Sequence, residues 1–170
     1  MKAAAQEIKA KLEASLQHVD ESAVVLLKGH LIIEEALNEI IGTFVFHSEQ
    51  LDKVRISFAQ KVAIARAMSL DEHENEMWQL ILAVNSLRNE LAHSLNSPKR
   101  QKKTKALIDL QKKLRGQTTA PDGSEVPEHV ILSFVVAFSL GFLSGFIEEV
   151  RRFRAWLDEM EKIINPHRHK

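Results

Sequence analysis

Residues 130–147 read VILSFVVAFSLGFLSGFI, eighteen positions without a charged side chain. This length reaches the threshold for a membrane-spanning helix, and Gly141 and Gly145 have the G-x-x-x-G spacing of membrane helix dimers. Three serines dilute the apolar run, however, and the charged residues 148–152 (EEVRR) follow it directly. We therefore expect a helix buried inside a bundle or a dimer interface, with both glycines at close helix contacts and no association with a membrane.

The helical pattern extends outward from this stretch over most of the chain. Apolar residues recur at helical intervals in the segments 3–17, 22–46, 51–68, 72–95, 102–114 and 128–164. The chain has only 6 Gly and 4 Pro, too few for many short strands, and residues 116–127 form the one clear loop. The sequence predicts an all-α fold, a single-domain antiparallel helical bundle over residues 1–170. Residues 1–20 are expected to be a helical lead-in and residues 165–170 a frayed tail.

The composition narrows the classes of function. Lys and Arg number 23, as do Asp and Glu, so a globally basic nucleic-acid-binding protein is not expected. The absence of cysteine excludes disulfides, thiolate zinc sites and cysteine nucleophiles. No apolar segment follows Lys2, so we expect no signal peptide and a cytoplasmic location. The 45% hydrophobic content is enough for a core, in which Trp78 and Trp156 are expected to lie.

A polar stripe crosses the predicted helix 72–95 near its end. Asn85, Asn89 and His93 are spaced four residues apart and therefore share one helix face, beside an apolar stripe. Arg88 lies on the flank of this face, and its long side chain can reach toward His93. Such a stripe is either a reactive site or a hydrogen-bonded seam at a dimer interface.

The string Arg88-Asn89-x-x-x-His93 resembles the Arg-x4-His signature of the HEPN superfamily. Residues 26–38 (LLKGHLIIEEALN) are similar to the second helix of HEPN proteins related to the mannitol operon repressor, and the resemblance covers roughly residues 24–93. It implies a homodimer of helical bundles with the two motifs facing each other across the two-fold axis. Active members are RNA endonucleases of toxin or defence systems that need no metal or other cofactor. The resemblance to the repressor implies the alternative, a non-catalytic transcriptional regulator or interaction module with an antitoxin or another protein as partner.

The residue types suit RNA cleavage on chemical grounds. A histidine can take the proton of the ribose 2′-OH and return one to the leaving 5′ oxygen, which yields a 2′,3′-cyclic phosphate. An arginine stays charged and can hold two phosphate oxygens. We therefore assign catalysis to Arg88 and His93, with Asn89 orienting the imidazole or contacting the phosphate.

His30, Glu34 and Glu35 form a second polar group on the segment 22–46. His30 and Glu34 are four residues apart, a spacing that can hold a metal, but no third ligand is visible and no metal site is predicted. We expect this pair to pack against helix 72–95. In a supporting role together with Asn85, Glu34 or Glu35 would pair with Arg88 or orient His93.

A basic segment follows the motif. Residues 98–115 contain eight Lys or Arg against Asp109 alone, a net charge of +7. Such a strip attracts a phosphate backbone and makes binding salt-sensitive, although no aromatic residue is present for base stacking. The alternatives are a solvated helix face and a surface for an acidic protein partner. The residues assigned to RNA binding are Lys99, Arg100, Lys102, Lys103 and Lys105.

Overall fold

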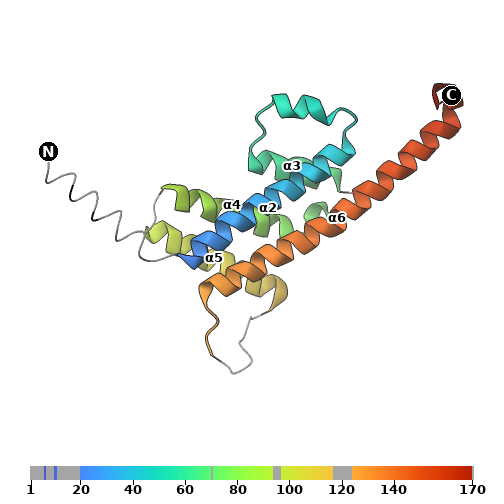
Figure 1. Cartoon of the computed structure of the whole chain (residues 1–170). Coiled ribbons are helices and arrows are strands. Elements are labelled where there is room, and N and C mark those ends of the chain that lie inside the picture. Colours follow the sequence, from blue (N-terminus) through green and yellow to red (C-terminus); the bar gives the residue numbers. More distant parts are fainter. Residues whose placement is uncertain are drawn as a thin grey trace.

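The computed structural model describes residues 20–69, 71–93, 97–116 and 124–169, together with the single positions 6 and 10. Within these ranges the chain is all-α and has no strand, which confirms the predicted fold class. The α-helices are α2 (Glu21–Phe44), α3 (Phe58–Met68), α4 (Met77–His93), α5 (Pro98–Arg115) and α6 (Glu128–Ile164) (Figure 1). Short 3₁₀ helices are η1 (Ser48–Lys53), η2 (Glu72–Glu74) and η3 (Pro166–His169), the last in place of the expected frayed tail. The predicted helix 3–17 lies outside the continuous described ranges.

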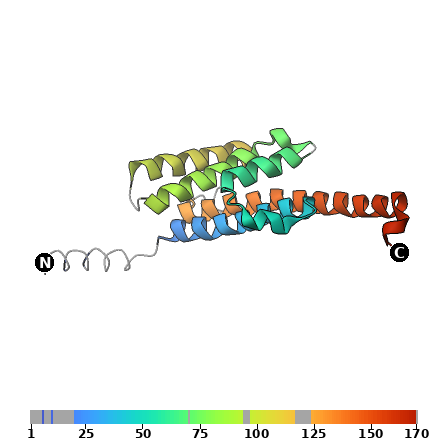
Figure 2. The same cartoon turned by 90° about the horizontal axis from the view of Figure 1, so that it is seen from above.

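The helices form two layers, with α2 and α6 in one and α3, α4 and α5 in the other (Figure 2). α2 and α6 run in the same direction. Their contacts pair, in order along both helices, Glu21 with His129, Gly29 with Val136, and Glu39 with Arg151. The prediction of an antiparallel bundle is therefore wrong for this helix pair, because the connection after Gly116 returns the chain to the end of the bundle where α2 begins.

The central helix α4 does run antiparallel to its neighbour α5. Glu76, just before α4, forms an ion pair with Lys113 near the end of α5, with Oε1 and Nζ 2.5 Å apart. Ser86 and Glu90, farther along α4, contact Lys103 near the start of α5. α4 thus lies between α5 on one side and α2 and α3 on the other.

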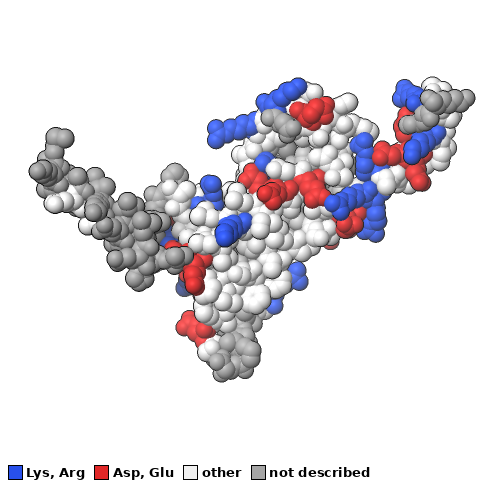
Figure 3. Space-filling view, in the orientation of Figure 1, with Lys and Arg blue, Asp and Glu red and all other residues white. Residues whose placement is uncertain are grey.

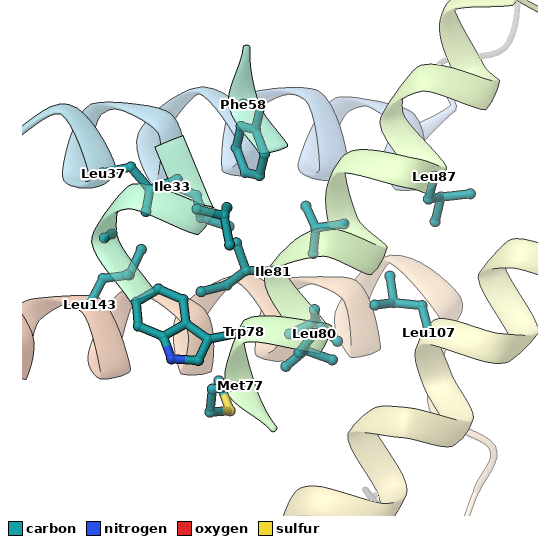
Figure 4. Close-up of a cluster of buried hydrophobic side chains, with 14 of the residues drawn as sticks. Ile33, Leu37, Phe58, Met77, Trp78, Leu80, Ile81, Leu87, Leu107 and Leu143 are labelled. Carbon is teal, nitrogen blue, oxygen red and sulfur yellow. The ribbon is translucent and has the colours of Figure 1, made fainter. Parts of the chain in front are cut away.

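The core gathers around Trp78 on α4 (Figure 4). Its side chain is fully buried against Phe142 and Phe146 of α6, and its indole N–H donates to the Glu72 carbonyl oxygen at 2.7 Å. Each fully buried Leu or Ile around it contributes about 1.5–3 kcal/mol relative to exposure. The core position predicted for Trp78 is confirmed. The one predicted for Trp156 is wrong, since this side chain is 54% exposed on the part of α6 that extends past the bundle.

Capping residues decide where the helices begin. Asp20 caps α2 by accepting from the Ala23 N–H at 2.9 Å, so the helix begins at Glu21, one residue before the predicted segment 22–46. Ser57 forms a capping box with Gln60, so α3 begins at Phe58. The predicted helix 51–68 is therefore divided in two, with the end of η1 and α3 separated by non-helical backbone. Ser97 caps α5 with proline at the first helical position, which places the start four residues before the predicted one.

The first half of α6 is less covered than its apolar sequence predicts. The bounds of α6 match the predicted segment 128–164. By length and composition α6 could cross a membrane, and only 28% of its most apolar 18-residue window is buried within the described structure. Gly141 and Gly145 are exposed, and no described atom lies within 4 Å of a Cβ built on either. The close contacts expected at these two glycines are therefore absent within the described chain.

The close helix contact occurs instead at Gly29 of α2. A Cβ at this position would overlap both methyl groups of Val136 on α6, including Cγ1 at 2.9 Å. Valine is stiff at χ1 and cannot rotate away easily. Gly29 is therefore the residue that lets α2 and α6 lie this close.

We predict that Gly29→Ala lowers the free energy of unfolding by about 1–3 kcal/mol, because the added methyl overpacks the contact with Val136. The matched control is Gly141→Ala, where no described atom opposes the new methyl and helix propensity should raise stability by about 0.5–1 kcal/mol. Urea denaturation midpoints measure both. Equal effects of the two substitutions would contradict the assignment of Gly29 as the contact glycine.

Candidate functional site

The polar stripe lies on the second half of α4, where α2 passes alongside. Val84, Leu87 and Leu91 are buried and hold this part of the helix against the core. Asn85 and Arg88 are half-buried on the neighbouring side, and Asn89 is exposed. The structure thus places three predicted site residues on one side of α4.

His30 of α2 meets this stripe at Asn85. Its Nε2–H donates to the Asn85 Oδ1 at 3.1 Å, between residues 55 positions apart in sequence. The imidazole stacks on Phe58 at 4.3 Å between ring centroids and is buried. The other ring nitrogen, Nδ1, is buried with no hydrogen-bond partner among the described residues. His30 therefore fixes α2, α3 and α4 together and is closed off from a substrate.

The surroundings keep His30 uncharged at neutral pH. Burial lowers the pKa of its imidazole below the ordinary 6.5, and the hydrogen bond to Asn85 opposes this shift. The positive charges of Arg88 and Lys61 lower the pKa further, whereas Glu34 raises it. His30 is thus a neutral positioning group.

The acidic pair on α2 is used differently from the expectation. Glu34 binds Lys61 of α3, with the Nζ and Oε1 atoms 2.6 Å apart and both side chains partly buried. It is therefore not the partner of Arg88, and Glu35 is exposed. Lys61 was not among the residues singled out from the sequence. No sequence signal identifies Lys61, because the side of α3 that packs against α2 is decided by tertiary contacts.

Arg88 keeps an unneutralised charge. Its Nη1 donates to the Oδ1 of the neighbouring Asn89 at 3.3 Å, and within the described ranges no carboxylate pairs with it. His93 is the last residue of α4. Its side chain lies outside the described residues, so the distance from Arg88 to the imidazole stays a prediction.

The basic residues of α5 divide into two groups. Arg100 pairs with Asp20 at 2.6 Å, and Lys103 pairs with Glu90 at 3.2 Å, so these two predicted RNA-binding residues stabilise contacts within the bundle. The hydrogen bond from the Ser97 hydroxyl, together with the Lys103 ammonium, holds the pKa of Glu90 below its usual range. Three further predicted lysines are exposed and make no hydrogen bond or ion pair with described residues: Lys99, Lys102 and Lys105.

The described residues contain no group of three His, Asp or Glu side chains that could hold a metal ion. His30 and Glu34 contact Asn85 and Lys61 instead of a shared ligand. No protein-family model matches the chain, and no curated protein and no solved structure is significantly similar to it. The family resemblance seen in the sequence therefore stays a prediction.

We predict that His30 makes stability depend on pH. Because the pKa of folded His30 lies below the unfolded 6.5, the unfolded state binds the proton more readily. This contribution to stability is present above about pH 6.5 and is lost as the pH falls toward the folded pKa. Between pH 7.5 and pH 5.5, the denaturation midpoint of the wild type should decrease more than that of His30→Gln. A His73→Gln variant, altered at an exposed histidine, should keep the wild-type pH dependence.

Proposed function

We propose that this chain is a HEPN-like, homodimeric, metal-independent RNA endonuclease, in which Arg88, Asn89 and His93 handle the scissile phosphate. The observation that carries the proposal is the half-buried guanidinium of Arg88, which has no carboxylate beside it within the described residues. The toxin or defence type of activity comes from the resemblance in the sequence.

Arg88 differs from the other partly buried cations of the bundle. Lys61 is neutralised by Glu34, Arg100 by Asp20, and Lys103 by Glu90. A partly buried charge without a counter-ion is costly, so an anionic ligand gains from binding beside it. The planar guanidinium is suited to two oxygens of one phosphate.

The proposed reaction needs one base and one acid. One His93 takes the proton of the 2′-OH, whose oxygen then attacks phosphorus and forms the 2′,3′-cyclic phosphate. The bond from phosphorus to the 5′ oxygen breaks, and the His93 of the second subunit donates a proton to that oxygen. Arg88 stabilises the negative charge that develops on the phosphoryl oxygens. His30 takes no proton in this scheme, because it is buried and neutral.

The surfaces next to the motif support an RNA substrate and a second subunit. α5 begins at Pro98, five residues after the end of α4, and presents exposed lysines along its length. On α2, Leu27 and Leu31 are 42% and 56% exposed. Leu27 lies on nearly the same side of α2 as His30, the side that faces α4. The outer face of α2 and the first half of α6, on the side of this layer away from α4 (Figure 2), has a broad area without charged side chains (Figure 3). A second subunit can also pack on this face.

We predict that the purified protein cleaves RNA in the presence of a chelator and leaves 2′,3′-cyclic phosphate ends. Arg88→Ala and His93→Ala should each lower the rate by about 10²–10⁴-fold, since each removes a group that acts on the transition state. Gel analysis of single-turnover cleavage, with end-group assignment by mass spectrometry, measures this.

The matched controls are Arg55→Ala and His73→Ala, which remove the same side-chain types from exposed positions in other elements. Both should cleave at the wild-type rate. A stable dimer that binds RNA and leaves it intact would contradict the nuclease proposal and favour the regulatory alternative. Loss of cleavage in all four variants would show that the activity is not specific to the motif.

We predict that the exposed lysines of α5 supply the salt dependence of RNA binding. Lys102→Glu and Lys105→Glu should weaken binding uniformly across RNA sequences, and loss of each phosphate contact should reduce the slope of log K against log [salt] by about 0.7–1. Lys53→Glu on η1 is the control with an equal change in net charge. Binding isotherms at several salt concentrations measure this, and an equal effect of Lys53→Glu would contradict a role for α5.

A further inference from the structure

The last third of α6 continues past the other helices and ends apart from them (Figures 1 and 2). This projecting part carries the large exposed apolar side chains Phe153, Trp156, Ile163 and Ile164, which are 41%, 54%, 72% and 67% exposed. Charges of both signs also gather on it (Figure 3). A helical segment this short is marginal in water without tertiary contacts.

The apolar residues of α6 follow a heptad pattern that crosses the end of the bundle. Their spacing alternates between three and four residues, as in a coiled-coil seam. The stripe consists of Leu143, Phe146, Val150, Phe153, Leu157, Met160 and Ile164. The first three are buried in the core. Of the last four, Phe153 is 41% exposed and stacks on Phe44 at the end of α2, Leu157 and Met160 are half-buried, and Ile164 is exposed. The face that packs against the bundle therefore continues beyond it only partly covered.

Two hollows follow this partly covered stripe. One lies where α6 leaves the bundle and is lined by Phe44, Met68 and Phe153, among others. The other runs along the projecting part and is lined by Phe46, Leu157, Met160 and Ile164 together with polar residues.

We propose that a second copy of this chain covers the stripe, with the projecting parts of the two α6 helices packed antiparallel about a two-fold axis. In the register that pairs Leu157 with Met160 of the second copy, Phe153 packs against Ile164 of the second copy. The two-fold axis generates a second copy of each of these two pairs. Trp156 then flanks the seam opposite Ile163 of the second copy. The pairing thus buries the four most exposed apolar side chains of this segment.

The charges beside the seam support this register. In an antiparallel pair, each residue that flanks the seam lies opposite a residue at the same heptad position of the second copy. Arg154 therefore lies opposite Glu161 of the second copy, and the two-fold axis generates a second such pair. Arg154 now contacts Asp158 at 3.2 Å through Nε, and its Nη1 is buried without an acceptor among the described residues. Glu161 contacts Arg168 at 3.6 Å. A parallel pair would instead place Glu161 opposite Trp156, so the antiparallel pair is the better match.

This interface is independent of the proposed nuclease site. The motif lies near the end of the bundle where α2 begins, and the projecting half of α6 lies at the other end. Removing the α6 pairing should therefore lower the mass of the assembly in solution, to that of the monomer or, where the subunits also pair through the motif, to that of the motif-paired dimer.

The first test uses the absence of cysteine from the chain. Phe153→Cys and Ile164→Cys chains are mixed and oxidised, and covalent dimers are resolved by gel and mass spectrometry. The antiparallel register predicts a dimer containing one chain of each variant. Either variant alone should give none, because like positions lie about 16 Å apart along the helix axis. Dimers of Phe153→Cys alone, or no mixed dimer, would overturn the proposal.

The second test is a charge exchange measured by analytical ultracentrifugation. Arg154→Glu and Glu161→Arg should each weaken the assembly, and the double variant should restore it because both symmetric ion pairs re-form with reversed sign. Leu157→Glu should lower the mass to that of the assembly without the α6 pairing, whereas Ala155→Glu on the opposite face of α6 should leave the mass unchanged. Circular dichroism confirms that each variant is folded. Unchanged mass in Leu157→Glu, or no restoration in the double variant, would contradict the antiparallel pairing.

Discussion

The close contact between α2 and α6 at Gly29 governs the arrangement of the bundle. Because glycine has no Cβ, Val136 can enter the surface of α2 and the two helices can run side by side in parallel. This contact uses one flank of α2. The other flank is then left to face α3 and α4, where His30 and Glu34 make their contacts. The site on α4 therefore depends on a packing contact made on the opposite side of a neighbouring helix.

Polar contacts between layers determine which charges remain available. Glu34, Asp20 and Glu90 each neutralise one cation from a neighbouring helix. These ion pairs connect neighbouring parts of the bundle, so the cations in them are not available to a ligand. Arg88 and the lysines Lys99, Lys102 and Lys105 of α5 have no such partners within the described ranges, so they carry the unpaired positive charge beside the motif. The division follows from geometry, since paired and unpaired cations alternate along the same short segment of α5.

The two ends of the molecule present different surfaces to a binding partner. Near the start of α2, the unneutralised Arg88 and exposed apolar residues of α2 lie close to one another in the fold. At the other end, α6 carries a partly covered heptad stripe with charged residues on both sides of it. The central part is held by the core around Trp78, whose burial is complete without any second chain. Association would thus add to a folded bundle and would not create it.

The sequence alone predicted each of the five described α-helices, and for α6 it also predicted the bounds. A 3.6-residue apolar period and a proline or capping residue act within a few residues of the chain. The side of α4 that carries Asn85, Arg88 and Asn89 followed from the same local geometry. The tertiary structure decided the rest. Gly29, and neither Gly141 nor Gly145, allows close packing, Trp156 is exposed although it follows the apolar pattern, and Glu34 binds Lys61. Each of these depends on which helix faces meet and where the bundle ends, and those facts arise from contacts between residues far apart in sequence.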